Sequence, residues 1–194
     1  MIGLVMLDPG NNSFKGQVTY VTWPFTFLLL AYNTCMRRIW NRPDLAVWSL
    51  STKDAEGQGN FNICTYVTSV SMQPKLMMIA IYHHTKTLEN LKADPQAILQ
   101  LLTRKQRDIV KTCGKRSGHN TNKLASVGKK HALATHDGLQ YLTDCAGIMH
   151  LTFTDFIEVG GDHVLGVAAV TGSQNFSEEP LLTTDYLKEH FIIR

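Results

Sequence analysis

From Asp44 onwards, short stretches of apolar and polar positions are separated by turn signals, a pattern typical of β-strands joined by tight connections. A continuous apolar run over 76–82 predicts a central strand covered on both faces. Other strands are expected at 45–52, 61–71, 97–102, 147–159 and 164–171. In the 147–159 strand, alternation places on one face Met149, Leu151, Phe153, Ile157 and Val159. Six or so short strands in antiparallel succession predict a mainly β fold, a β-barrel with peripheral helices.

Turns and helices between these strands are marked by glycine, proline and capping residues. The stretch 53–59 predicts a glycine-bearing hairpin connection, and Pro74 ends the polar strand because proline cannot donate to a ladder. Helices are expected at 85–93, at 105–112 before Gly114, and at 183–190. In the first of these helices Thr85 can act as the cap, Leu88 and Leu91 face inward, and Pro95 stops the helix.

Residues 1–41 differ from the rest of the sequence. A turn signal at 8–11 precedes an aromatic, β-leaning stretch over 14–32. We therefore expect two parts: an N-terminal arm over 1–41, which packs on the main body or on a partner chain, and a barrel domain over 42–194. No function can be assigned to the arm.

Composition and charge exclude several classes of protein. The chain has 194 residues, 44% of them hydrophobic, and a formal net charge of +3 with no run of Lys and Arg longer than two. A dedicated nucleic-acid binder should carry a concentrated basic stripe. The apolar run 25–31 is far shorter than the ~20 residues that a membrane span needs. Four widely spaced cysteines indicate free thiols in a reducing compartment. We expect a cytoplasmic protein with neither a nucleic-acid nor a membrane partner.

Small polar side chains occupy both alternation classes of the stretch 60–74. They are Thr65, Ser69 and Ser71 in one class and Asn62, Cys64 and Thr68 in the other. Small residues let a flat ligand approach the backbone, and hydroxyl groups with free N–H groups can hold an anion. The alternative is a Thr-rich edge strand with solvated hydroxyls. Within this stretch Cys64 is better explained as a small core residue than as a reactive thiol.

Two further polar segments allow both a binding and a purely structural interpretation. The segment 83–87 lies at a strand-to-helix junction, where free helix N–H groups and Lys86 could receive a phosphate. The commoner explanation of such a sequence is a capped helix with a solvated lysine. The basic loop 115–123 could close over an anionic ligand or lie on the surface. Neither His131 nor His136 has the spacing of a zinc site, and hydrolase, P-loop and dinucleotide motifs are absent, so no metal site is expected.

In this order and spacing, the segments resemble the flavin reductase-like family of FMN-binding split barrels, and in particular its flavoredoxin-like branch. The first half of the resemblance is carried by the strand 47–52 with its hairpin, the run 60–71, Pro74 and the apolar strand 76–81. The second half is carried by Thr85, Thr87 and Asn90, by 117–124 in place of the family's Ser-Gly-Arg-x-x-Asp-Lys-Phe loop, and by 162–167. The match runs from about residue 44 to residue 173.

The resemblance implies a split-barrel homodimer with one FMN per subunit at the dimer interface. It also implies an NAD(P)H-dependent flavin reductase, with NADH or NADPH as co-substrate. Reduced flavin would pass electrons to free flavin, to a partner oxygenase or to another acceptor. Two alternatives remain. One is an FMN-binding electron carrier that meets a protein donor and uses no nicotinamide, and the other is a barrel that has lost its cofactor.

Site residues follow from the same resemblance. The isoalloxazine ring would meet Asn62, Ile63, Cys64, Thr65 and Tyr66. The ribityl chain and phosphate would be served by Ser69, Ser71, Thr85, Lys86 and Thr87. The loop residues that would close the site are Ser117, His119, Asn122 and Lys123, with His119 contacting phosphate or nicotinamide. Here His119 replaces the family's Arg and Asn122 its Asp, which removes a permanent bidentate charge and predicts looser FMN binding.

Overall fold

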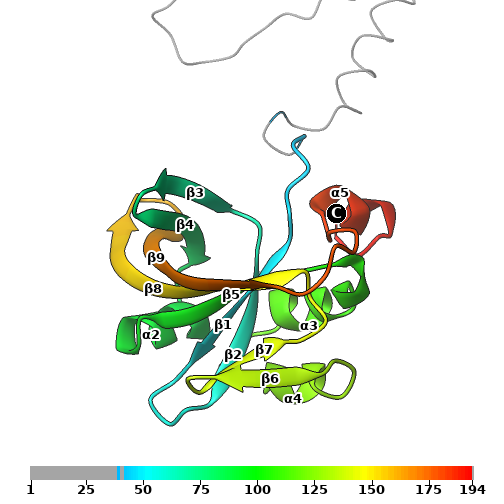
Figure 1. Cartoon of the computed structure of the whole chain (residues 1–194), viewed down its shortest axis with the longest axis horizontal. Coiled ribbons are helices and arrows are strands. Elements are labelled where there is room, and N and C mark those ends of the chain that lie inside the picture. The colour runs from blue at the N-terminus through cyan, green and yellow to red at the C-terminus, as the bar shows by residue number, and fades with distance from the viewer. Residues whose placement is uncertain (1–38, 40–41, 194) are drawn as a thin grey trace, which may run out of the picture. The chain divides into compact units, whose positions relative to one another are not determined.

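Antiparallel pairing organises the part of the chain described by the computed structural model, which comprises Ile39 and residues 42–193 (Figure 1). The strands in this part are β1 (Trp48–Lys53), β2 (Gly59–Cys64), β3 (Val67–Met72), β4 (Lys75–Tyr82), β5 (Gln96–Leu101), β6 (Leu133–His136), β7 (Leu139–Leu142), β8 (Gly147–Glu158) and β9 (His163–Asn175). Seven of them form one sheet in the order β2-β1-β5-β8-β9-β4-β3, and β6 pairs with β7. The mainly β architecture is therefore confirmed, whereas the expected arm over 1–41 lies outside the described residues apart from Ile39.

Short helices surround the sheet. They are α2 (Lys86–Ala93), the 3-10 helix η2 (Arg104–Gln106), α3 (Ile109–Lys115), α4 (Lys123–Val127) and α5 (Thr184–Glu189). The helices predicted at 85–93 and 183–190 are confirmed, with Thr85 and Thr183 as N-caps. The prediction at 105–112 is wrong in detail. A capping box between Thr103 and Gln106 closes η2 as a separate turn, and α3 continues through Gly114.

The single polar strand predicted at 61–71 is wrong, because the chain forms two strands there. β2 pairs with β1 and β3 pairs with β4, so the two strands lie at opposite edges of the sheet. Between them the chain turns at Thr65 and Tyr66, where the Tyr66 carbonyl accepts a hydrogen bond from Ala80 N at 3.0 Å. Within β3, Thr68 and Ser69 are both exposed, so the small polar residues occupy both alternation classes because neither face of this strand is buried. Side chains of an edge strand such as β3 are largely exposed.

Two further strand predictions are corrected by burial. β4 is covered mainly on one face, since Met77, Ile79 and Ile81 are buried while the residues between them are half-buried. In β8 the register shifts between Phe153 and Asp155, so the apolar face does not continue to the end of the strand. Consequently Leu151 and Phe153 are buried, but Ile157 is 48% exposed and Val159, just beyond the strand, 52%. The β6–β7 hairpin and α4 have no counterpart in the sequence predictions.

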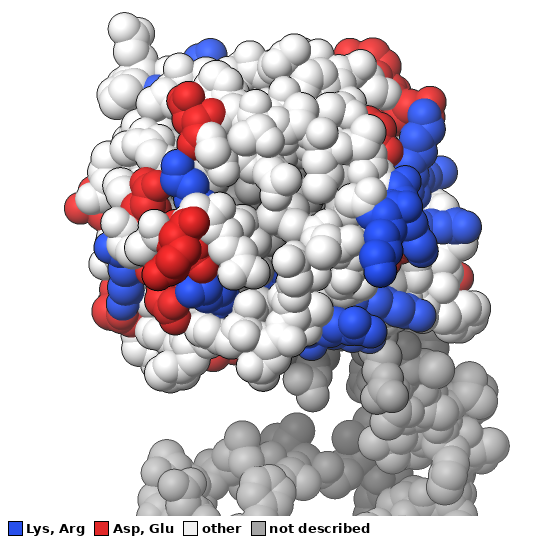
Figure 2. Space-filling model, turned by 90° about the horizontal axis from the view of Figure 1, so that it is seen from below, with Lys and Arg blue, Asp and Glu red and all other residues white. Residues whose placement is uncertain are grey.

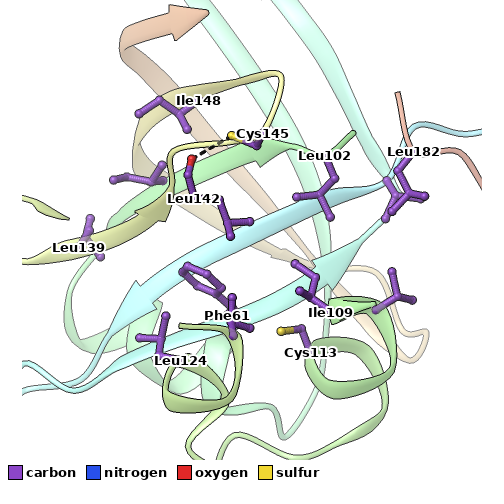
Figure 3. Close-up of a cluster of buried hydrophobic side chains, with 14 of the residues drawn as sticks. Phe61, Leu102, Ile109, Cys113, Leu124, Leu139, Leu142, Cys145, Ile148 and Leu182 are labelled. Carbon is purple, nitrogen blue, oxygen red and sulfur yellow. Dashed lines mark hydrogen bonds between the residues drawn. The ribbon is translucent and has the colours of Figure 1, made fainter. Parts of the chain in front are cut away.

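The core consists of two clusters on opposite faces of the central strands. On β5, Ile98 belongs to one cluster and its neighbour Leu99 to the other, and both are fully buried. Figure 3 shows the first cluster, in which Phe61 of β2 lies among Leu124 of α4 and Cys113 of α3. Burial of a large apolar side chain contributes about 1.5–3 kcal/mol, so this cluster holds α3 and α4 against β2.

A buried glutamine joins the β6–β7 hairpin to the sheet. The Gln100 side chain is fully buried, and its Oε1 accepts a hydrogen bond from Leu142 N at 2.7 Å. Its Nε2 donates to Ser49 Oγ at 3.3 Å, so both ends of the amide are satisfied. Because an unpaired buried polar group costs about 1–3 kcal/mol, these bonds specify where the hairpin lies.

A histidine held between two carboxylates lies after the C-terminal end of α4. It connects this segment to the N-terminal end of α3 and to the β7–β8 connection. His131 Nε2 lies 2.9 Å from Asp108 Oδ1, and Nδ1 lies 3.1 Å from Asp144 Oδ2. Lys130 Nζ also lies 3.2 Å from Asp108 Oδ2. Burial opposes the charged imidazole, but its hydrogen bonds to Asp108 and Asp144 outweigh burial and raise the pKa of His131.

This arrangement predicts a specific dependence of stability on pH. Because the folded state binds the His131 proton more tightly than the unfolded state, its stabilisation is complete below the ordinary histidine pKa of about 6.5 and is lost as pH rises through the folded pKa. At pH 6, His131→Ala should lower the free energy of unfolding by about 2 kcal/mol, measured by urea denaturation. The difference between the two proteins should shrink at higher pH. His136→Ala, which alters an exposed histidine, is the control, and a difference for His131→Ala that stays constant from pH 6 to 9 would contradict the assignment.

Candidate functional site

A pocket of about 320 Å³ opens between β2, the N-terminus of α2 and the segment that joins α3 to α4. Its wall carries four basic side chains and no carboxylate: Lys86, Lys115, Arg116 and Lys123. The remaining lining residues are Asn60, Asn62, Ile63, Tyr82, His84, Thr85, Thr87, Gly114, Ser117 and Gly118. A concave site with one sign of charge concentrates ligands of the opposite sign, so this pocket suits an anion.

The N-terminus of α2 supplies the pocket with open backbone donors. Thr85 Oγ1 accepts a hydrogen bond from Leu88 N at 3.3 Å and donates one to the Tyr82 carbonyl at 2.9 Å. The N–H of Glu89 donates to the Thr85 carbonyl at 3.1 Å. Within the described chain no acceptor is bonded to the N–H groups of Lys86 and Thr87. Such free donors at a helix N-terminus, with the helix dipole behind them, are typical of phosphate sites.

Close packing at Gly118 brings the loop after α3 against β2 and α2. Asn60 Nδ2 donates to Thr87 Oγ1 at 3.0 Å, and both side chains are buried. A Cβ at Gly118 would collide with Asn60 Oδ1 and would lie 3.0 Å from Lys86 Cβ. Only glycine therefore lets the loop approach this closely, which closes one side of the pocket.

Lys123 is a buried cation that has no carboxylate partner in the described chain. Its side chain is 4% exposed, and its Nζ donates to the Cys113 carbonyl at 2.9 Å. Burial lowers the pKa of Lys123, because an ammonium group is poorly solvated there. A ligand anion in the pocket would supply the missing counter-charge.

Lys86 stands at the wall between the pocket and an adjoining polar hollow of about 270 Å³. Its Nζ lies 2.7 Å from Glu89 Oε1 and 3.6 Å from Asp54 Oδ2. The hydrogen bond from Lys86 lowers the pKa of Glu89, and the same bond raises the pKa of Lys86. His119 Nδ1 lies 3.8 Å from Glu89 Oε2. Both Lys86 and His119 therefore face the carboxylate of Glu89.

The structure places the predicted site residues in three groups. The residues that line the pocket are Asn62, Ile63, Thr85, Lys86, Thr87, Ser117 and Lys123. Two more, His119 and Asn122, line the adjoining hollow, where Asn122 Oδ1 also caps α4 by accepting a hydrogen bond from Ala125 N. The others line neither hollow: Cys64, Thr65, Tyr66, Ser69 and Ser71.

Local contacts explain why this last group lies outside the pocket. Cys64 is in the second core cluster, where burial raises the pKa of its thiol to about 12, as expected of a core residue. Ser69 Oγ lies on the edge strand β3, 3.3 Å from Met77 Sδ. Tyr66 lies in the connection between β2 and β3, and its ring makes an edge contact with His163 at 5.8 Å between centroids.

Several pocket residues were absent from the predicted set. Lys115 and Arg116 belong to the basic loop that the sequence singled out, so their charge was the available signal. His84 has a left-handed backbone with φ of 56°, which no pattern of residues indicated. The Tyr82 ring contacts His163 in a tilted arrangement, at 3.8 Å between centroids and 36° between the ring planes, and forms an aromatic part of the wall. Figure 2 shows that basic side chains gather along one edge of the face in view, while acidic and basic ones mix at the other.

Other chemistry finds little support among residues 42–193. A hollow of about 420 Å³ near His136 and His150 is larger, but its cation Lys53 already donates to the Asp137 carbonyl at 2.7 Å. No group of three or more His, Cys, Asp and Glu in the described part is arranged to hold a metal ion. None of the described helices has the length and apolar composition required to cross a bilayer.

Comparison with known proteins shows the family of the chain and structures with the same fold. The model of the flavin reductase like domain matches residues 44–188. Among solved structures, the styrene monooxygenase flavin reductase of Pseudomonas putida is 20% identical, with a TM-score of 0.62 over 73% of this chain and 86% of that one. The NADH:FAD oxidoreductase of Streptomyces globisporus is 14% identical, with a TM-score of 0.66 over 86% and 92%. Flavoredoxin of Desulfovibrio vulgaris is 16% identical, with a TM-score of 0.61 over 74% and 78%.

These structural likenesses lie at low identity and therefore show the fold. They confirm the split barrel that the sequence predicts. A structure from Sinorhizobium meliloti, 21% identical with a TM-score of 0.65, is matched over 84% of this chain but only 51% of its own, so the chain spans about half of that protein. No curated protein matches the sequence.

The close packing at Gly118 gives a testable prediction. Gly118→Ala should push Asn60 from its place and weaken its bond to Thr87, lowering the free energy of unfolding by about 1–3 kcal/mol in urea titrations. Gly161→Ala is the matched control, because a Cβ there meets no atom within 4 Å. Equal stability of the two variants would show that the loop does not need glycine at position 118.

Proposed function

Because the chain belongs to the flavin reductase-like domain family, we propose that it binds FMN and works as an NAD(P)H-dependent flavin reductase. Family membership supports a flavin-related oxidoreductase function. The observation that carries the proposal is the pocket wall with four cations and no carboxylate at the open N-terminus of α2. These donors fit the phosphate of a flavin mononucleotide.

In this proposal the phosphate lies against the N–H groups of Lys86 and Thr87, with the hydroxyl groups of Thr85 and Ser117 on the same wall. Lys123 supplies a buried positive charge. Arg116 supplies a permanent guanidinium, the group that is missing at His119 relative to the family's loop. The charge lost at one loop position is thus offset by another position of the same loop.

For the flavin ring, we propose a place beside the outer part of the wall, formed by Asn62 and Ile63 of β2 and by Tyr82. Bound FMN supplies the hydride and electron chemistry. The chain's task is to hold the ring, to shield one side with the Tyr82–His163 ring pair and to place donors near the edge that gains negative charge. Four residues predicted to touch the flavin remain candidates only for a site completed by a second subunit: Thr65, Tyr66, Ser69 and Ser71. Cys64, also predicted there, is a core residue.

We propose that the second subunit is another copy of the chain. Large apolar side chains are exposed on β3, at the ends of β4 and β8 and beside these strands: Tyr66, Val70, Met72, Tyr82, Ile157 and Val159. Met72 is 80% exposed, which is unusual for a methionine. Covering these residues would remove an apolar area from water and favour a homodimer.

A cytoplasmic location and electron transfer to free flavin, a partner oxygenase or another acceptor belong to the same proposal.

A second function is favoured by one specific departure. The loop carries His119 and Asn122 where the family's loop has Arg and Asp, and both residues lie in the adjoining hollow rather than in the pocket. If that hollow served the nicotinamide in related proteins, its change here would favour an FMN-binding electron carrier that receives electrons from a protein. A barrel without cofactor is the third possibility, and the next experiment separates all three.

The proposed reductase makes a direct spectroscopic prediction. The protein mixed with FMN should show a flavin band whose shape changes on binding, and NADH or NADPH added under argon should bleach it within seconds to minutes. A bound flavin that keeps its band with both nucleotides would instead indicate the carrier. Failure to bind FMN at all would mean that the barrel holds no flavin.

The role proposed for Lys123 in binding the phosphate can be tested by substitution. Lys123→Met removes the buried charge at similar volume, so the variant should stay folded, with a stability lowered by at most about 1–3 kcal/mol because the Cys113 carbonyl loses its donor. Its affinity for FMN should fall by about 1.5–3 kcal/mol, the scale of a hydrogen bond to a charged group, as measured by flavin fluorescence. Lys111→Met changes an exposed lysine on α3 outside the pocket and should leave the affinity unchanged. Unchanged FMN affinity in Lys123→Met would remove Lys123 from the phosphate site.

A further inference from the structure

Glu89 lies beside both Lys86, which lines the proposed phosphate site, and His119, which lines the adjoining hollow. Its Oε1 lies 2.7 Å from Lys86 Nζ and its Oε2 lies 3.8 Å from His119 Nδ1. The carboxylate is 58% exposed, whereas Lys86 is 21% exposed. An exposed anion thus occupies donors that a ligand anion would also use.

The position of Glu89 on α2 adds to this competition. Glu89 lies in the first turn of the helix, where a negative charge interacts favourably with the helix dipole. A phosphate at the same N-terminus would draw on the same dipole and would experience repulsion from the nearby carboxylate. Glu89 therefore competes both for Lys86 and for the field of the helix.

The other acid near Lys86 has a different task. Asp54 Oδ2 lies 3.6 Å from Lys86 Nζ, but Asp54 Oδ1 accepts a hydrogen bond from Gln58 N at 2.8 Å and so holds the β1–β2 turn. Asp54 is also mostly buried, at 13% exposure. By contrast, in the described chain Glu89 contacts no charged group except Lys86, His119 and the more distant Asp54. Its carboxylate contributes little to the fold beyond these surface contacts.

We propose that Glu89 is a built-in competitor of the flavin phosphate, which weakens the binding of FMN because it holds Lys86. This inference rests on the proposed function. When the phosphate binds, Lys86 must either leave Glu89 or hold the phosphate beside a carboxylate, and both alternatives lower the affinity.

The test compares Glu89→Gln with the parent protein by titrating FMN and riboflavin and following flavin fluorescence. Glutamine keeps the size of the side chain and removes its charge, and the position is exposed, so the fold should persist. FMN should bind roughly threefold to tenfold more tightly to Glu89→Gln. Riboflavin, which lacks the phosphate, should bind both proteins equally. The gain for FMN should shrink as salt is raised from 0.05 to about 0.5 M, because salt screens exposed charges.

Glu179→Gln is the matched control. Glu179 forms a surface ion pair with Lys105 at 2.9 Å, away from the pocket, so its loss should leave both affinities unchanged. An FMN affinity that is equal or weaker in Glu89→Gln overturns the inference while the proposed function stands. An equal gain for riboflavin also overturns it, since Glu89 would then not act through the phosphate. If neither the parent nor the variant binds FMN, the proposed function fails, and this inference fails with it.

Discussion

Two buried hydrogen bonds between amide and hydroxyl groups hold α2 against the sheet, and the candidate site depends on them. Asn60 Nδ2 donates to Thr87 Oγ1 at 3.0 Å, and Asn90 Nδ2 donates to Thr52 Oγ1 at 3.1 Å. All four side chains are at most 5% exposed, so water cannot replace either bond. With α2 fixed in this way, its N-terminus stays beside β2, and α3 and α4 bring their cations to a place that is already set.

Most of the fold could be predicted from local patterns, and the exceptions share one cause. The helix 85–93 follows from a cap, two inward leucines and a proline, all within eleven residues. The prediction of one strand over 61–71 was wrong because two strands that follow each other along the chain lie at opposite edges of the sheet. Likewise, the exposure of Ile157 depends on a register shift against β9. Pairing between distant segments determines such features, and a local alternation of apolar residues cannot contain them.

The residues of the candidate site also fall into those that a local pattern identifies and those that depend on contacts across the fold. Thr85, Lys86 and Thr87 could be identified because a capped helix start exposes its donors whatever lies around it. That these residues share a site with the loop 115–123 could be predicted only from the order of the segments, which resembles that of a known family. The sequence alone could not indicate that Arg116 would line the pocket while His119 would face Glu89. That division depends on how the loop passes Gly118, which is a matter of contacts across the fold.

The cysteines of the described part are protected from oxidation by their burial. Cys64, Cys113 and Cys145 are all buried, and burial raises the pKa of their thiols to about 12, 12 and 11, respectively. A thiolate is the form that reacts with peroxide and disulfides, and these groups have almost none of it at neutral pH. Reduced flavins give peroxide when they meet oxygen. The barrel would therefore tolerate the by-products of the chemistry proposed for it without sulfur oxidation at these three positions.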